Sequence, residues 1–256
     1  MKAVLLAGGL GTRMREETEF RPKPMVEIGG KPILWHIMKI LSMHGISDFI
    51  VCSGYKHEMV SSYFLNYRAT SAPFTINLGS GLVTLKNQDP GVEWNVTVVN
   101  TGELTPTGGR IKAVEPYVDG DEFLVAYGDG VANVDIKSLI GMHRGSSAEA
   151  TVTAVQPQSR YGVLELSEQS MVKSFREKPQ VQDWINIGYF VFNRSIFNRL
   201  HSESVLEEGP LRDLAQEGAL QAFKHQGFWE PMDTFREYQH LQSLWTSGNA
   251  PWKTWD

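Results

Sequence analysis

The sequence is poor in cysteine, which limits the chemistry and the architecture available to the chain. Its one cysteine, Cys52, cannot form a disulfide within the chain and has no Cys or His neighbours at zinc-ligand spacing. Cys52 lies in the apolar run 48–53, which predicts a buried strand residue. No cysteine-based framework is therefore expected, and a lone buried thiol is consistent with a reducing cytoplasm.

Long apolar runs and clusters of basic residues are also missing. No run of about 20 apolar residues exists, so we expect no membrane span. The short apolar start at 1–6 is interrupted by glycines, which is not typical of a signal peptide. The formal net charge is −5, and no basic cluster alternates with aromatic residues, which argues against a nucleic-acid surface. No repeat or low-complexity segment is present in the 256 residues.

Strands and helices alternate through the first half of the sequence. Short apolar runs predict strands at 3–7, 49–52, 96–99, 123–127 and 150–155, and helical periodicity predicts helices at 31–44, 57–67, 108–115 and 135–144. This order indicates an α/β fold, with a Rossmann-like, mostly parallel sheet flanked by helices and right-handed crossovers.

The pattern changes in the remaining segments. A weakly patterned stretch, 69–95, holds a predicted hairpin at 75–78 and 82–86, and a second antiparallel pair is predicted at 162–165 and 172–177. A further strand is expected at 187–193 and helices at 195–200, 210–217 and 235–246. Trp252 and Trp255 lie in the tail that follows, where we expect them to pack on the body or on a partner chain.

A glycine-rich loop follows the first predicted strand directly, at Gly8-Gly9-Leu10-Gly11-Thr12-Arg13. Glycines there allow the backbone to approach a ligand and to present N–H groups to phosphate oxygens. Arg13 adds a fork of donors suited to phosphate, and Lys23 adds a point charge between two prolines. The dinucleotide-binding pattern fails because its third glycine would fall on Met14, and no P-loop triplet Gly-Lys-Ser/Thr exists. The loop predicts a phosphate site of another design.

Together, Leu6 to Arg13 and the following Lys23-Pro24 resemble the signature of the sugar nucleotidyltransferases, or NDP-sugar pyrophosphorylases. Other segments resemble the members of that family that use CTP and glucose 1-phosphate, namely 23–38, 101–102 with 107–110, 127–130, 227–233 and 250–255. The resemblance runs over the whole chain. It implies a nucleotide-diphospho-sugar transferase fold with a small antiparallel sugar-binding portion. It also implies a homo-oligomer in the cytoplasm that supplies CDP-glucose for O-antigen or lipopolysaccharide sugars.

We expect one domain over 1–256, with a nucleotide-binding portion at 1–156, a sugar-phosphate portion at 157–234, and a C-terminal helix and tail at 235–256. The resemblance makes Arg13, Lys23 and Asp129 catalytic. It assigns nucleotide binding to Leu6, Ala7, Gly8, Gly9, Leu10, Gly11, Thr12, Arg13, Lys23, Thr101, Gly102, Thr105, Arg110 and Gly128. The candidate base pocket consists of Thr101-Gly102 and Gly108-Gly109-Arg110, which follow a strand beside the glycine loop, although Arg110 could equally support the triphosphate.

Asp129 stands just after the predicted central strand 123–127. In open parallel sheets, ligands bind outside the carboxyl ends of the strands. A carboxylate there would repel a triphosphate unless Mg²⁺ lay between them, and Mg²⁺ favours one or two carboxylates plus phosphate oxygens. Asp233 is the second expected ligand, and only the resemblance pairs it with Asp129. Asp135 precedes a helix, which favours a capping role.

The resemblance places the sugar phosphate near Tyr127, Glu177, Lys178, Asn186 and Gly188. Lys178 would bind the phosphate, and Glu177 would accept hydrogen bonds from sugar hydroxyls. Ile187 replaces the first glycine of the Asn-Gly-Gly segment of the family, so a backbone contact there is not carried over.

Three alternatives remain open from the sequence. The first is the same reaction with UTP, dTTP or another sugar phosphate. The second is a protein that binds a nucleotide sugar without turnover, and the third is an NAD-binding oxidoreductase. Retention of Arg13, Lys23, Asp129 and Asp233 argues against the second, and Met14 argues against the third.

Overall fold

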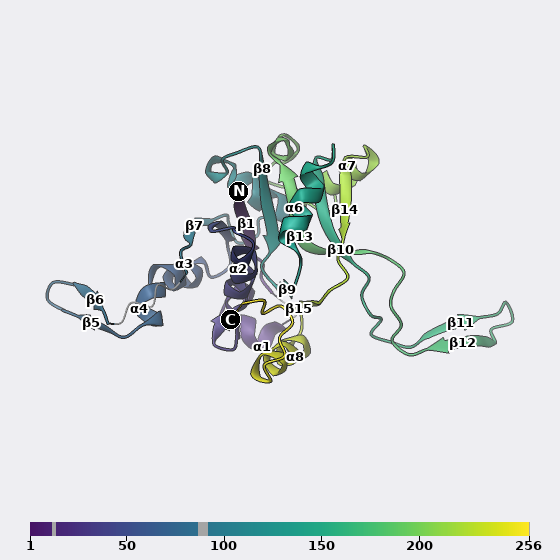
Figure 1. The fold of residues 1–256 in the computed structure, drawn as a ribbon, viewed down its shortest axis with the longest axis horizontal. Coiled ribbons are helices and arrows are strands. Elements are labelled where there is room, and N and C mark those ends of the chain that lie inside the picture. Colours follow the sequence, from purple (N-terminus) through teal and green to yellow (C-terminus); the bar gives the residue numbers. More distant parts are fainter. Residues whose placement is uncertain (12–13, 87–91, 256) are drawn as a thin grey trace.

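A seven-stranded sheet forms the centre of the computed structural model, which describes residues 1–11, 14–86 and 92–255 (Figure 1). Its strand order is β14-β10-β13-β8-β1-β4-β7. β13 runs antiparallel to both of its neighbours, and the other adjacent pairs are parallel. The strands are β1 (Lys2–Ala7), β4 (Asp48–Ser53), β7 (Asn95–Asn100), β8 (Glu122–Tyr127), β10 (Ala150–Val155), β13 (Ile185–Asn193) and β14 (Leu220–Lys224). The mostly parallel sheet expected from the sequence is confirmed.

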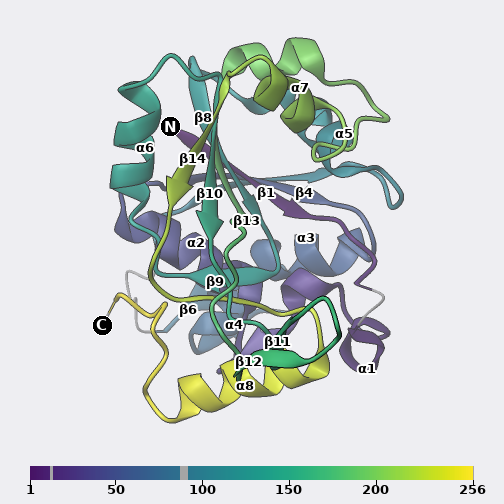
Figure 2. The ribbon, with the colours of Figure 1, turned by 90° about the vertical axis from the view of Figure 1, so that its right-hand side faces the viewer.

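Helices cover both faces of the sheet (Figure 2). On one face lie α2 (Ile33–Met43), α3 (His57–Leu65) and α6 (Ile136–Arg144), and on the other α5 (Thr107–Ala113), α7 (Pro210–Gln216) and the 3-10 helix η4 (Arg194–Arg199). Side chains alternate between the two cores along β1, where Leu5 belongs to the first core and Val4 to the second. Near-continuous apolar sequence in the central strands follows from this two-sided burial.

Most predicted elements are observed with small shifts at their ends. The helix expected from residue 31 begins at Ile33 because 31–32 form β3 (Lys31–Pro32), which pairs with β2 (Glu27–Ile28). The segment expected as a helix at 195–200 is the 3-10 helix η4. β14 was not predicted, since its sequence LQAFK has no β-branched residue, and its pairing with β10 forms in the tertiary structure. Shorter elements are α1 (Arg15–Thr18), η3 (Glu115–Tyr117) and α4 (Tyr67–Ser71).

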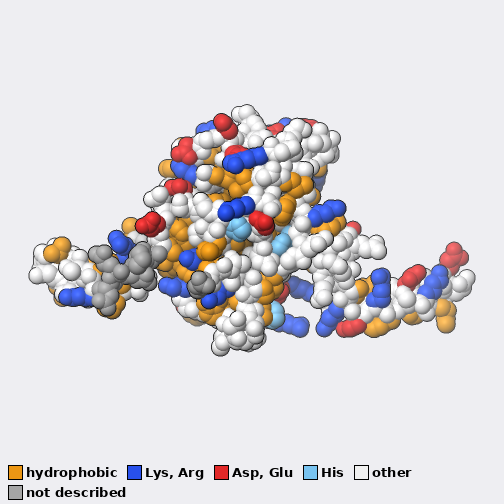
Figure 3. All heavy atoms as spheres, viewed as in Figure 1, with side chains coloured by type: hydrophobic (Ala, Val, Ile, Leu, Met, Phe, Trp, Pro, Cys, Tyr) orange, Lys and Arg blue, Asp and Glu red, His pale blue; other side chains and the backbone are white. Residues whose placement is uncertain are grey.

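Two hairpins project from opposite sides of the body, as Figures 1 and 3 show. The first arm is formed by β5 (Phe74–Ile76) and β6 (Val83–Leu85), and the second arm by β11 (Val163–Leu166) and β12 (Val172–Arg176). Both confirm the predicted antiparallel pairs. Apolar side chains remain exposed on each, which distinguishes these arms from the packed body.

The C-terminal segment packs against the body. Helix α8 (Phe235–Thr246) is followed by a tail in which Trp252 is fully buried and stacks on Phe228 and Trp245. The ring of Trp255 lies edge-on to Trp35 of α2. The expected packing of the tail tryptophans on the body is confirmed. Over the described ranges, no helix has the length and apolar character needed to cross a membrane.

Candidate functional site

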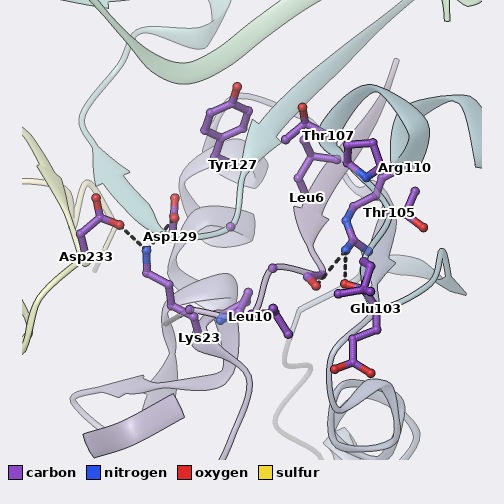
Figure 4. Close-up of a pocket in the computed structure, with 17 residues that line it drawn as sticks. Leu6, Leu10, Lys23, Glu103, Thr105, Thr107, Arg110, Tyr127, Asp129 and Asp233 are labelled. Carbon is purple, nitrogen blue, oxygen red and sulfur yellow. Dashed lines mark hydrogen bonds and ion pairs between the residues drawn. The ribbon is translucent and has the colours of Figure 1, made fainter. Parts of the chain in front are cut away.

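A pocket of about 520 Å³ opens where β1 and β8 end (Figure 4). Most of the residues expected to bind a nucleotide or a metal gather there from distant parts of the chain. The pocket is lined by Leu6, Gly8, Gly9, Leu10, Gly11, Lys23, Pro24, Glu103, Leu104, Thr105, Pro106, Thr107, Arg110, Tyr127, Gly128, Asp129 and Asp233. Its place at the carboxyl ends of parallel strands is the one in which such sheets bind ligands.

The glycine loop forms one wall and is held from both sides. A side chain at Gly8 would collide with the guanidinium of Arg110, since a Cβ there would lie 1.9 Å from an Arg110 nitrogen. Gly9 has open space where its Cβ would be, so its backbone faces the pocket unobstructed. Gly11 has a φ of +62°, and its carbonyl accepts a hydrogen bond of 3.0 Å from Thr18. Thr12 and Arg13, both expected in this loop, lie outside the described residues.

Arg110 ties the glycine loop to the segment 101–103. Its buried guanidinium donates hydrogen bonds to the carbonyls of Gly8 (2.9 Å), Gly102 (2.7 Å) and Glu103 (3.0 Å), and to Thr101 Oγ1 (2.8 Å). Burial lowers the pKa of this guanidinium from its ordinary value. Because these donors are directed to the chain itself, Arg110 acts on a ligand by shaping the pocket wall.

Three expected nucleotide-binding residues stand behind the pocket wall. Ala7 is fully buried in the core beneath the sheet end. The Thr101 hydroxyl donates to the Ser53 carbonyl at 2.8 Å, and Gly102, at φ +96°, presents its carbonyl to Arg110. None of the three lines the pocket.

Lys23 lies between the two expected metal-binding carboxylates. Its Nζ is 2.7 Å from Asp129 Oδ2 and 2.5 Å from Asp233 Oδ1 (Figure 4). Lys23 belongs to the 3-10 helix η2 (Lys23–Met25), and only 8% of its surface is exposed. The three charges therefore face one another at the end of the pocket beside the glycine loop.

A small antiparallel ladder brings the two carboxylates together. β9 (Gly130–Ala132) pairs with β15 (Trp229–Pro231), and the Met232 N–H donates to the Asp129 carbonyl at 2.8 Å. Beyond it, Glu237 of α8 accepts hydrogen bonds from the backbone N–H groups of Asp233 (2.8 Å) and Thr234 (2.9 Å) and pairs with Arg160. The backbone of Asp233 is thereby held by a buried carboxylate that the sequence did not point to.

The opposite side of the pocket carries hydroxyl groups. Tyr127 and Thr107 both line it, and both donate to the carboxylate of Glu207, the latter at 2.7 Å. Burial and the nearby Glu207 charge raise the pKa of Tyr127 above its ordinary value, so its hydroxyl stays protonated. Glu207 was missed by the sequence reasoning, since a Glu in the segment 201–209 carries no local motif, whereas Thr107 belongs to the segment 107–110 that resembles the family.

The expected sugar-phosphate residues are placed differently from the nucleotide residues. Glu177 and Lys178 follow β12 at the base of the second arm, are 4.0 Å apart and largely exposed, and do not line the pocket. Gly188 packs against the ring of Tyr127, where a Cβ would come within 2.6 Å, and its N–H donates to Asn186 Oδ1 at 2.8 Å. Of this group, only Tyr127 reaches the pocket directly.

Two further expectations are confirmed outside the pocket. Asp135 caps α6, with its carboxylate accepting the Ser138 N–H at 3.0 Å. Cys52 is fully buried, and burial raises the pKa of its thiol to about 12, so it has no role as a nucleophile at neutral pH.

The chain is similar to known proteins over almost its whole length. The family model for nucleotidyl transferases matches residues 2–239. A glucose-1-phosphate cytidylyltransferase of Salmonella typhi is 50% identical over 261 residues, and a probable glucose-1-phosphate cytidylyltransferase of Bacillus subtilis (strain 168) is 40% identical over 257 residues; each alignment covers 100% of both chains. The structure of a UDP-glucose pyrophosphorylase complexed with UDP-glucose matches 96% of this chain and 98% of that chain with a TM-score of 0.69, at 18% identity, which is a likeness of fold.

Proposed function

This chain belongs to the nucleotidyl transferase family, and on that premise we propose that it transfers a cytidylyl group from CTP to α-D-glucose 1-phosphate, giving CDP-glucose and pyrophosphate. It is a nucleotidyltransferase, and the full-length similarity to glucose-1-phosphate cytidylyltransferases supports these two substrates. The observation that carries the proposal is the meeting of Lys23, Asp129 and Asp233 beside an open glycine loop in one pocket.

The pocket has two chemically distinct ends. The glycine loop, Lys23 and the two aspartates form an end that suits phosphates and a cation. The segment 103–107 and Tyr127 form the other wall, along which the nucleoside would lie. Tyr127 also packs against Gly188, so it would stand between the nucleoside and the sugar. Arg13, which belongs to the family signature, would donate to the β- and γ-phosphates.

In the reaction, a phosphate oxygen of the sugar attacks the α-phosphorus in line. A new O–P bond forms as the bond between the α-phosphorus and its bridging oxygen breaks, and pyrophosphate leaves with that electron pair. A phosphomonoester has a second pKa near ~6 and is already an anion at neutral pH, so no general base is needed. The protein contributes positioning and compensation of charge. Lys23 pairs with both carboxylates in the structure and would stabilise the α-phosphate once a cation pairs with them in its place.

Asp129 and Asp233 would hold Mg²⁺. Their carboxylates meet at Lys23 from the turn between β8 and β9 and from the segment after β15, and Mg²⁺ favours one or two carboxylates plus phosphate oxygens. Within the described ranges no group of three or more His, Cys, Asp or Glu is placed to hold a metal, so phosphate and water would complete the ligand set. When bound, the ion supplies neutralisation of the charge that develops on the triphosphate.

Glu177 and Lys178 would act on glucose 1-phosphate from the base of the second arm. Lys178 would offset the repulsion between the sugar phosphate and the triphosphate. Glu177 would accept hydrogen bonds from sugar hydroxyls, and the amide of Asn186 would donate to a sugar oxygen. Gly188 would keep the Tyr127 ring in place against this side.

A pyrophosphate-release assay tests the proposal. The full chain is incubated with Mg²⁺ and α-D-glucose 1-phosphate and with each of CTP, UTP, dTTP and ATP in turn. We expect turnover with CTP and little with the others. Preference for UTP or dTTP would assign the same chemistry to another base, and no release with any of them would favour a non-catalytic nucleotide-sugar-binding protein.

We also propose that copies of this chain associate through the arms. Leu78 and Leu82 at the tip of the first arm are 87% and 67% exposed, and Phe175 of the second is 62% exposed. Apolar groups gathered on a projecting surface mark a contact site. Light scattering should give a mass that is a multiple of 28.7 kDa, and Leu78→Asp with Leu82→Asp should lower it. A monomeric wild type would contradict this.

The cellular setting is a proposal of the same kind. The likeness to the CTP-using family members supports a cytoplasmic enzyme whose product serves O-antigen or lipopolysaccharide sugars, and the free, buried Cys52 is consistent with a reducing compartment. Fractionation of the cells that produce the chain, with detection of CDP-glucose, checks both points.

A further inference from the structure

Glu207 bridges two hydroxyl groups of the pocket wall. Its Oε2 accepts a hydrogen bond of 2.7 Å from Thr107 Oγ1, and its Oε1 accepts one from the Tyr127 hydroxyl. Thr107 is the first residue of α5, and Tyr127 is the last of β8, so the carboxylate joins two elements that form the nucleoside end of the pocket. Glu207 itself comes from the segment between η4 and α7 and is exposed to solvent.

Glycines in α5 allow this segment to sit closely enough for the bridge. A Cβ at Gly109 would lie 2.0 Å from the Ser202 carbonyl, and one at Gly108 would lie 2.8 Å from Ser204. The Gly109 N–H donates to the Ser204 carbonyl at 3.0 Å, and the adjoining Leu206 is fully buried. The segment that carries Glu207 is therefore packed closely against α5, although the Glu207 side chain itself is exposed.

The bridge decides which way the two hydroxyls point. A carboxylate only accepts hydrogen bonds, and each hydroxyl has a single hydrogen to donate. With that hydrogen directed to Glu207, Tyr127 and Thr107 can offer only lone pairs to a ligand. The Leu206 N–H, which donates to Thr107 Oγ1 at 3.0 Å, further fixes the orientation of that hydroxyl. Tyr127 and Thr107 lie at the upper edge of the pocket in Figure 4, and because both hydroxyls donate to Glu207, this edge offers acceptors to a ligand.

We infer that Glu207 is a positioning residue that makes this wall select a base with an amino group over a base with a carbonyl group at the same place. The inference rests on the proposed function. Cytosine offers an N4 amino donor where uracil and thymine offer the O4 acceptor. Thr107 already accepts the Leu206 N–H, and the Tyr127 hydroxyl also contacts Asn186, so each oxygen keeps one lone pair for a ligand. Amino hydrogens would meet these remaining lone pairs, whereas a carbonyl oxygen would face them without a donor. A wall that offers only acceptors disfavours a ligand that brings a further acceptor to the same place, because neither group then has a hydrogen to donate.

Ribose and glucose hydroxyls do not account for the arrangement. A hydroxyl both donates and accepts, so it would pair with either orientation of Tyr127 and Thr107. An edge of acceptors discriminates only between a ligand that offers a donor and one that offers an acceptor at the same place. Cytosine differs from uracil and thymine in this way.

Glu207→Gln is the sharpest test. Its side-chain amide can accept from one hydroxyl but must donate to the other, which turns the hydrogen of that second hydroxyl toward the pocket. We expect the ratio of kcat/KM for UTP to that for CTP to rise at least about tenfold, which lies within the range that one good base contact discriminates. The KM for α-D-glucose 1-phosphate should change by less than about twofold. A general weakening of the fold would instead change the kinetic constants for both substrates.

Glu208→Gln is the matched control, since it removes the same charge from the neighbouring exposed position. Its UTP-to-CTP ratio should equal that of the wild type. Tyr127→Phe provides a second variant, which keeps the ring and removes one acceptor, and it should also lower the preference for CTP.

The wild-type measurement separates this inference from the function on which it rests. A wild type that prefers UTP or dTTP overturns both. A CTP-specific wild type whose preference survives both Glu207→Gln and Tyr127→Phe overturns the role of Glu207 alone. A change confined to the KM for the sugar phosphate also overturns it, because it would assign Glu207 to the other substrate.

Discussion

Lys23 donates a hydrogen bond of 2.5 Å to Asp233 although the two residues are 210 positions apart in the chain. The same ammonium group contacts Asp129 at 2.7 Å. Three charges of mixed sign thus occupy the place where phosphates and a cation would meet. On binding of CTP with Mg²⁺, the cation would pair with the carboxylates, and the ammonium group would pair with the α-phosphate. The same three side chains would thus compensate charge in both the free and the nucleotide-bound protein.

Lys23→Ala is expected to reduce kcat by about a hundredfold or more, since the removal of one aligned donor to a developing charge typically has that effect. The variant also leaves Asp129 and Asp233 facing each other without a compensating charge. Steady-state pyrophosphate release measures kcat, and circular dichroism checks that the fold remains. Near-normal turnover by a folded Lys23→Ala protein would remove the lysine from the mechanism.

Asp129→Asn and Asp233→Asn are expected to raise the Mg²⁺ concentration at half-maximal activity by about tenfold or more, because each removes an anionic ligand from a hard cation. Titration of activity with Mg²⁺ gives this value. Asp135→Asn is the matched control, since Asp135 caps α6 away from the pocket. It should leave the Mg²⁺ titration unchanged, and equal Mg²⁺ curves for all three variants would contradict the proposed metal site.

Arg110→Lys is expected to lower the free energy of unfolding by about 1–3 kcal/mol or more, because a lysine cannot satisfy the carbonyls of Gly8, Gly102 and Glu103 together. The glycine loop would then be less ordered, and the KM for CTP should rise. Urea unfolding without nucleotide separates this role from direct phosphate binding. An unchanged unfolding free energy with weaker CTP binding would instead show that Arg110 contacts the triphosphate.

Acid is expected to destabilise the fold through His36. Burial lowers its pKa from 6.5 to about 4, so between these values the unfolded chain binds a proton that the folded chain does not. The free energy of unfolding therefore falls as the pH falls through this window, by about 2 kcal/mol at about pH 5, and the His36 contribution stops changing below its folded pKa. Neutral His36 contacts the Ile28 carbonyl at 2.8 Å through Nε2 and accepts from Trp252 at 3.4 Å through Nδ1.

Urea unfolding of wild type and His36→Gln at several pH values measures the contribution of His36 to the free energy of unfolding. The variant is expected to be less stable at neutral pH but to lose less stability on acidification, since it has no ring to protonate. Parallel curves for the two proteins would show that another group governs the acid response.

Local features of the site could be predicted from the sequence because they depend on neighbouring residues. The loop from Gly8 to Gly11 follows a short apolar strand, and its glycines are needed wherever a backbone approaches a ligand or another chain segment closely. Asp129 follows a central strand, and the capping role of Asp135 was evident from its position before a helix. The alternation of strands and helices likewise predicted the layers of the fold.

Other features depended on which distant groups meet. The sequence marked Arg110 as a possible nucleotide contact, but the partners of a guanidinium are set by packing, and here they are carbonyls of the chain. Glu207 showed no pattern at all, since it acts from a segment without regular structure. Glu177 and Lys178 were expected at the sugar site, and the structure puts them at the base of an arm outside the described pocket.

The sequence by itself determined most of the elements, the glycine loop and the family resemblance, because periodicity, glycine placement and motif spacing are properties of short segments. Only the tertiary structure decided that Asp129 and Asp233 share one ammonium group, since the pairing of β9 with β15 joins residues about a hundred positions apart. It likewise decided the polarity of the pocket wall. A hydroxyl can donate or accept, and the neighbour that fixes its choice is supplied by the fold.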